Sequence, residues 1–157
     1  MNVPLYEKIW MWAAAGMIAA FLVTTGVGAI AGALQPPSHV ETIDPTKVWT
    51  DPRFAQRGVS GDTTHVTVVA VAMTFAFVPN EIHVPARTPV TFRLTSVDVN
   101  HGFEIVGTNG NTMLIPGYVS QFTTRFDTPG EYLIVCNEFC GLAHHTMSGK
   151  LIVEARP

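Results

Sequence analysis

The chain carries little charge for its length. Asp, Glu, Lys and Arg make up only 13% of its 157 residues, the formal net charge is −3, and the nine basic residues form no cluster. Binding to a phosphate backbone requires a clustered basic face, so the composition excludes nucleic acid as a partner. The sequence also lacks internal repeats and low-complexity tracts. Its length suits one domain with a hydrophobic core plus an appendage.

Cysteine is scarce as well. The chain has two, Cys136 and Cys140, and they lie four residues apart. In a domain outside the membrane, such a pair alone indicates a structural disulfide, because that compartment is oxidising and the spacing is geometrically feasible. The histidines and the methionine nearby favour a metal site instead. A disulfide between the two remains the expectation for a metal-free form.

Hydrophobic residues are abundant, and their excess is concentrated in residues 9–34, which contain no charge. At about 1.5 Å per residue this run makes a helix of roughly 39 Å, longer than a hydrocarbon core of ~30 Å. Trp10 and Trp12 lie near its start, where amphipathic rings favour the membrane interface. Residues 1–34 are therefore predicted to form one transmembrane anchor. The alternative is a cleaved signal peptide with a small-residue site at 31–33, but a signal core has only ~7–15 residues.

The remainder divides into a linker and a β domain. Residues 35–62 contain the pairs Pro36-Pro37, Asp44-Pro45 and Asp51-Pro52 and few periodic apolar positions, which indicates an extended linker with room for one short turn of helix. Residues 63–157 show short apolar or alternating runs bounded by Pro, Gly, Asn and Asp, a pattern typical of an all-β sandwich or barrel. The two-residue alternation places Val68, Ala70 and Ala72 on one face of a strand. Predicted strands cover residues 65–72, 81–84, 89–95, 103–106, 112–114, 120–126, 130–135 and 150–154.

Both cysteines belong to a dense group of metal-binding side chains, residues 136–147 (CNEFCGLAHHTM), directly after a predicted strand. Thiolate, imidazole and thioether form a soft ligand set that selects copper or zinc over magnesium or calcium. Met147 favours copper, because thioether is a poor zinc ligand but is the weak axial ligand of copper sites that also use Cys and His. A further histidine, His101, stands at the head of a predicted strand. A single copper needs only one cysteine, so the second thiolate indicates two copper ions bridged by both sulfurs.

Through the pattern Cys-x-Glu-x-Cys-Gly-x-x-His-x-x-Met and the upstream His101, the sequence resembles the CuA domain of cytochrome c oxidase subunit II. The resemblance implies a mainly β, cupredoxin-like Greek-key sandwich behind one N-terminal transmembrane helix. It also implies a dinuclear copper centre in which Cys136 and Cys140 bridge the two ions. The other ligands would be His101 with Met147 on one copper, and His144 with the Glu138 carbonyl oxygen on the other.

The function implied by the resemblance is electron entry into a terminal haem-copper oxidase. Electrons would pass from cytochrome c or a similar donor to CuA, and then to haem in subunit I, which reduces oxygen to water. The single anchor resembles the B family, since A-family subunits II typically have two spans. This implies a bacterial or archaeal plasma membrane with the CuA domain on the outer, periplasmic side. Residues 73–80 lack the tryptophan-rich entry motif of the A family, which makes Phe75 the candidate entry residue, with a core aromatic as the alternative.

The roles of His145, Asp98 and Glu138 each have an alternative. His145 follows His144 directly, so the spacing to Met147 favours His144 without excluding its neighbour. Asp98 either accepts a hydrogen bond from His101 and orients the imidazole, or caps a turn. In A-family relatives the glutamate equivalent to Glu138 also binds magnesium at the boundary with subunit I, and the sequence does not decide whether this chain shares that ion.

Three other functions fit parts of the sequence. A CuA subunit of a nitric oxide reductase would use the same electron entry with different partner chemistry. A membrane-tethered mononuclear cupredoxin would carry copper with only one of the two cysteines. A copper-free β-sandwich would use a disulfide as a staple. The remaining histidines, His39, His65 and His83, are interpreted as solvated or locally hydrogen-bonded.

Overall fold

The computed structural model describes residues 4–30 and 41–155, which belong to two separate compact units divided after His39. The last residues of the predicted anchor, 31–34, and the first of the predicted linker, 35–40, lie outside the described residues, as do His39 and the small-residue site at 31–33. Each unit is considered by itself.

The first unit is the helix α1 (Leu5–Ile30), which is 26 residues long and has no buried residue. Its length and apolar composition allow it to cross a membrane. The hydroxyl of Thr24 donates to the carbonyl oxygen of Ala20, 2.9 Å away, so this polar group is satisfied inside the helix. A bilayer core offers no water to satisfy such a group, and the internal bond removes that cost.

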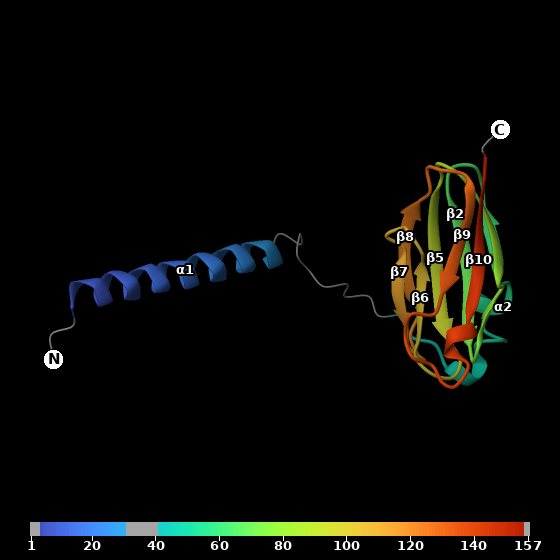
Figure 1. Cartoon of the computed structure of the whole chain (residues 1–157), viewed down its shortest axis with the longest axis horizontal. Coiled ribbons are helices and arrows are strands. Elements are labelled where there is room, and N and C mark those ends of the chain that lie inside the picture. The colour runs from blue at the N-terminus through green and yellow to red at the C-terminus, as the bar shows by residue number, and fades with distance from the viewer. Residues whose placement is uncertain (1–3, 31–40, 156–157) are drawn as a thin grey trace. The chain divides into compact units, whose positions relative to one another are not determined.

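The second unit is a β-sandwich of two five-stranded sheets whose strands run along the length of the domain (Figure 1). The first sheet contains β1 (Gly58–Gly61), β2 (Val66–Met73), β3 (Ala76–Val78), β5 (Pro89–Ser96) and β8 (Ser120–Arg125). The second contains β4 (Glu81–Pro85), β10 (Ser148–Glu154), β9 (Gly130–Val135), β6 (His101–Ile105) and β7 (Asn111–Leu114). β2 pairs with β5 in parallel in the first sheet, and β10 pairs with β4 in parallel in the second, while the other pairs are antiparallel.

The core between the sheets is built from the alternating positions that the sequence indicated. Val68, Ala70 and Ala72 of β2 are all buried, as expected for one face of a strand. Aromatic rings fill the middle of the sandwich: Phe92 lies 5.8 Å from Phe103 between ring centroids, and 5.0 Å from Phe122 in a stacked arrangement. This packing provides a rigid support for the residues at the ends of the strands.

The opposite face of β2 is covered by a segment that was predicted to be an extended linker. Residues 41–57 contain η1 (Pro45–Lys47) and α2 (Pro52–Ala55). The side chains of Ile43, Val48 and Phe54 in this segment are buried. These three pack with Val69 and Val71 of β2 in a second hydrophobic cluster. The part of the predicted linker that the structure describes is therefore part of the domain.

The reason for this difference lies in the Asp-Pro pairs. Asp44 and Asp51 each cap a short helix by accepting a hydrogen bond from a backbone N–H two residues later, and the following proline occupies the first helical turn. Proline is compatible with that position because its missing N–H would have no intrahelical partner there. The pairs thus begin helical turns instead of interrupting structure. All eight predicted strands occur, shifted by at most a few residues, and the short strands β1 and β3 are additional.

Candidate metal centre

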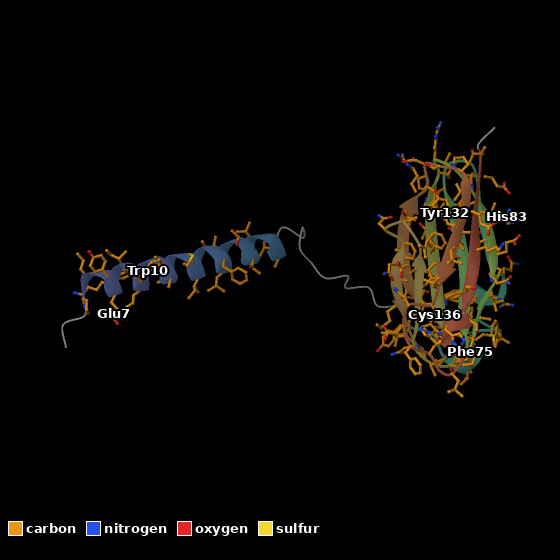
Figure 2. The ribbon with its side chains drawn as sticks, in the orientation of Figure 1. Glu7, Trp10, Phe75, His83, Tyr132 and Cys136 are labelled. Atoms are coloured by element: carbon orange, nitrogen blue, oxygen red, sulfur yellow. The ribbon has the colours of Figure 1, made fainter. Side chains whose placement is uncertain are left out.

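Neighbouring strands of the second sheet bring the predicted ligands together. Loop 136–147 leaves β9 after Val135 and enters β10 at Ser148, and it includes η2 (His144–Thr146). β9 lies between β10 and β6, and β6 begins at His101. Figure 2 places Cys136 and Phe75 toward the same end of the sandwich. The loop and the histidine therefore meet at one end of the domain.

Three donor atoms converge in the interior of this end. One nitrogen of His101 and the sulfurs of Cys136 and Cys140 all lie within 4.8 Å of one another, and all three residues are buried. The two Sγ atoms are 3.7 Å apart, and both thiols are free. The Nδ1 atom of His101 lies 3.9 Å from the Cys136 sulfur. Two unbonded sulfurs this close, with an imidazole nitrogen beside one of them, match the donor arrangement of a soft-metal site.

Three further donors surround the sulfurs. The Nδ1 atom of His144 lies 3.6 Å from the Cys140 sulfur, and the Sδ atom of Met147 lies 3.7 Å from the same sulfur. The carbonyl oxygen of Glu138 lies 3.1 Å from the Cys136 sulfur. All six predicted ligand residues are thus brought together. The imidazole of His101 and the carbonyl oxygen of Glu138 lie near the Cys136 sulfur, and the imidazole of His144 and the thioether of Met147 lie near the Cys140 sulfur. Of the adjacent histidines, His144 approaches a sulfur, whereas His145 is exposed.

The imidazole of His101 is oriented by Asp98. Its Nε2 atom lies 2.8 Å from Oδ1 of Asp98, which also accepts from the backbone N–H of Val99, while Oδ2 accepts from the backbone N–H of Thr74. Burial raises the pKa of Asp98, but the hydrogen bonds from His101, Thr74 and Val99 outweigh it and lower this pKa to about 2. An ionised carboxylate only accepts hydrogen bonds, so Nε2 of His101 donates to Asp98, and the ring is held with Nδ1 facing the Cys136 sulfur.

The thiol of Cys140 is protonated while no metal is bound. Burial, and then the hydrogen bond and charge of Cys136, raise the pKa of Cys140 to about 11. Metal binding needs thiolates, so it must release a proton from Cys140. The donor set, the close approach of the free thiols and their burial all fit a copper site.

Phe75 lies beside the ligand loop and is half-buried, packed against the main core. Its ring atom Cε1 is 3.0 Å from the place that a Cβ on Gly141 would occupy, and Gly141 has φ +131°. A side chain at position 141 would crowd the ring of Phe75 and would strain the backbone. Neither this contact nor the hydrogen bond from Thr74 to Asp98 was predicted, because each joins residues far apart in the sequence without a motif that links them.

A β-sandwich that gathers two thiols, two imidazoles and a thioether at one end, in a chain with an apolar helix long enough to cross a membrane, defines a membrane-anchored copper protein of the cupredoxin fold. Residues 61–155 match the family described as cytochrome c oxidase subunit II, periplasmic domain. The chain belongs to the cytochrome c oxidase subunit II family, and the predicted family and fold class are confirmed.

Individual relatives agree with this assignment. Cytochrome c oxidase subunit 2 of Thermus thermophilus is 38% identical over 156 residues, which cover 95% of this chain and 92% of that protein. A chain of a heme-copper terminal oxidase dimer solved by cryo-EM is 32% identical, with a TM-score of 0.64 and coverage of 92% of this chain and 99% of that one. The periplasmic domain of subunit II of cytochrome oxidase from Bradyrhizobium japonicum matches in fold, with a TM-score of 0.53, 20% identity and coverage of 57% and 83%.

Proposed function

We propose that this chain is the electron-entry subunit of a terminal haem-copper oxidase, and that its metal centre is dinuclear. Electrons enter from cytochrome c or a similar donor and leave to haem in subunit I, where oxygen is reduced to water. The observation that carries the proposal is the pair of buried, unbonded sulfurs 3.7 Å apart, each with an imidazole Nδ1 within 3.9 Å. A mononuclear site would leave one of these thiols without a role.

Six residues of this chain would hold the copper pair. Cys136 and Cys140 would supply the sulfurs that both ions share. His101 and Met147 would be the further ligands of one copper, and His144 with the carbonyl oxygen of Glu138 those of the other. When bound, a copper pair that shares its sulfur ligands accepts and passes on one electron with little change in geometry. The positions of the donor atoms support the membership of this ligand set, because each donor lies within 3.9 Å of a sulfur, whereas the division of the donors between the two ions rests on the family resemblance.

The protein surroundings favour small structural change on electron transfer. Cys136, Cys140, His101 and Met147 are almost inaccessible to water. The Asp98 carboxylate fixes the ring of His101, and the backbone N–H of Cys136 donates to the carbonyl oxygen of Met147 across the base of the loop at 3.2 Å. Buried ligands on a supported loop leave little room for rearrangement.

The proposal extends to the partners and the side of the membrane. In this proposal the domain faces the periplasm with α1 as the anchor, which is supported by the description of the matched family as a periplasmic domain. Phe75, which is half-buried beside Gly141 of the ligand loop, is proposed as the point of electron entry. The side chain of Glu138 is exposed, and it is the group that would contact magnesium at the boundary with subunit I if that ion is present.

Elemental analysis and electron paramagnetic resonance test the metal centre. The reduced full-length chain, solubilised in detergent and reconstituted with copper, is expected to contain two copper ions per polypeptide. Its oxidised form is expected to be purple and to show the signal of one unpaired electron shared by both ions. A blue protein with one copper would contradict the dinuclear proposal and favour a mononuclear cupredoxin. A chain that binds no copper after reduction would favour the disulfide-stapled domain.

A further inference from the structure

The two halves of the metal centre come from strands whose backbone pairing stops just before the ligands. β6 and β9 pair in antiparallel register at Ile105 with Ile134 and at Glu104 with Val135. Continued by two residues, this register would place Gly102 opposite Asn137. The ladder ends before that point, so backbone pairing does not join the His101 side of the site to the Cys136 side.

The side chain of Asn137 occupies the place where the ladder is missing. Its Nδ2 group donates to Oε2 of Glu104 at 3.0 Å and to Oδ1 of Asn111 at 3.3 Å. Glu104 and Asn111 face each other on β6 and β7. One amide group from the ligand loop therefore binds both strands of the neighbouring hairpin, in place of the backbone hydrogen bonds that β9 would have supplied.

Gly102 provides the space for this arrangement. A Cβ added at Gly102 would overlap the Oδ1 atom of Asn137 and would lie 2.8 Å from the backbone nitrogen of Asn137. Real Cβ atoms essentially never come within 3.0 Å of such a neighbour, so a larger residue would push the loop away from β6. The amide of Asn137 is thus seated over the backbone of the residue that follows His101.

The side of the ligand loop that faces β10 is held by backbone hydrogen bonds. The backbone N–H of Cys136 donates to the carbonyl oxygen of Met147, and the β9–β10 ladder continues to Ser148 opposite Val135. Cys136 is therefore fixed by backbone pairing toward β10 and by the side chain of Asn137 toward β6. Asn137 lies between Cys136 and Glu138, whose carbonyl oxygen approaches the Cys136 sulfur.

We infer that Asn137 is a positioning residue for the metal centre. Its contacts with Gly102 and Glu104 form what we call the interlock. The interlock sets the distance between His101 and the part of the site formed by Cys136 and Glu138. The inference rests on the proposed metal-binding function of loop 136–147. It assigns Asn137 no contact with the metal, because its amide is engaged with Glu104 and Asn111.

The test compares Asn137→Ala with the matched control Asn109→Ala in the full-length, detergent-solubilised chain. Asn109 accepts a similar side-chain hydrogen bond from Thr124, in the connection between β6 and β7 after Ile105. In the reduced, metal-free chain, Asn137→Ala is expected to speed hydrogen exchange of the amides of residues 136–140 by about tenfold. In the copper-loaded chain it is expected to weaken copper retention against a chelator by about tenfold, with an altered resonance spectrum. Asn109→Ala is expected to leave both measurements unchanged.

A double-mutant cycle with Glu104 separates positioning from a general loss of stability. Asn137→Asp puts acceptor against acceptor and should loosen the loop, whereas Glu104→Gln keeps an acceptor and should have little effect. The double variant Asn137→Asp with Glu104→Gln restores a donor and acceptor pair, so loop exchange and copper retention should recover. Gly102→Ala gives a second, independent displacement of Asn137 and should resemble Asn137→Ala.

Two outcomes would overturn the inference: wild-type exchange and copper retention in Asn137→Ala, or no recovery in the double variant. The experiment also separates this inference from the proposed function. If the wild-type chain binds fewer than two copper ions, the dinuclear proposal fails, whereas the exchange rates of the metal-free chains still decide whether Asn137 positions the loop.

Discussion

At the scale of single residues, the donor atoms depend on neighbours outside the ligand set. Asp98 selects which nitrogen of His101 faces the sulfurs, and the absence of a side chain at Gly141 makes room for the ring of Phe75. Asp98 was a candidate for this role from its position three residues before His101, whereas the contact between Phe75 and Gly141 joins residues far apart in the sequence and is visible only in the fold.

Substitution of the ligands gives the most direct prediction at this scale. Either Cys136→Ser or Cys140→Ser should abolish the dinuclear resonance spectrum, because one bridging sulfur is lost. His145→Ala should retain the spectrum, since His144 is the histidine near a sulfur. The measurement is the resonance spectrum and copper content of each purified variant. Loss of the spectrum in His145→Ala would show that the ligand was assigned to the wrong histidine.

The pH dependence of stability is predicted for a residue on the surface of the second sheet. Hydrogen bonds to Glu81 and then to Glu154 raise the pKa of His83 above its ordinary value of 6.5. The folded state thus favours the protonated ring, and this stabilisation is complete below the ordinary value and lost as pH rises through the raised pKa. Because His83 is exposed, solvent screening makes the effect small.

Urea unfolding of the metal-free chain measures this effect. The difference in denaturant midpoint between wild type and His83→Gln should be larger at about pH 5.5 than at about pH 9. Glu81→Gln is the control, because it keeps the imidazole but removes the charge of one partner. The denaturant midpoint of Glu81→Gln should vary less with pH than that of the wild type, but should still vary. A midpoint difference that is the same at both pH values would refute the assignment.

At the scale of elements, the segment 41–57 is the main addition to what the sequence predicted. The single Phe54 of α2 is completely buried against β2, so Phe54→Ala should destabilise the domain by about 3 kcal/mol through lost burial and a cavity. Phe139, which is 76% exposed, is the matched control, and Phe139→Ala should change stability by less than ~0.5 kcal/mol. Denaturant unfolding measures both. Equal small effects would mean that α2 does not contribute to the fold.

The strands were predictable and this segment was not, for a physical reason. Strands of a sandwich alternate between core and surface or are buried throughout, so Val68, Phe92 and their neighbours give a periodic pattern. Ile43, Val48 and Phe54 are spaced irregularly, because they lie in and between two short helical turns and an isolated bridge rather than in one regular element. For the site, the clustered donors in residues 136–147 gave the chemistry, but the Gly102 and Asn137 interlock depends on where the β6–β9 ladder stops. No local pattern in the sequence records that position.

At the scale of the whole molecule, electron entry is a property of the assembled oxidase. Phe75→Ala in the intact complex should slow reduction of the centre by cytochrome c, on the order of tenfold, equal to about 1.4 kcal/mol of barrier. Reduction by a small chemical reductant should be unaffected, because that route does not require docking. Stopped-flow absorbance measures both rates. Equal rates with cytochrome c in wild type and variant would remove Phe75 from the entry path.

The same preparation distinguishes the two partner chemistries that share this kind of subunit. Consumption of oxygen, and not of nitric oxide, by the purified complex is expected for a terminal oxidase. Rapid consumption of nitric oxide alone would assign the chain to a nitric oxide reductase.

The order of strands in the second sheet also constrains biogenesis. The ligand loop is closed on one side by β10, which pairs with β9 and with β4, a strand synthesised much earlier. During translation, His101 and both thiols therefore emerge before the strand that closes their loop. Because β10 follows Met147 directly, the six donors are held together only once β10 has inserted between its two neighbours, so the copper site is completed late in folding.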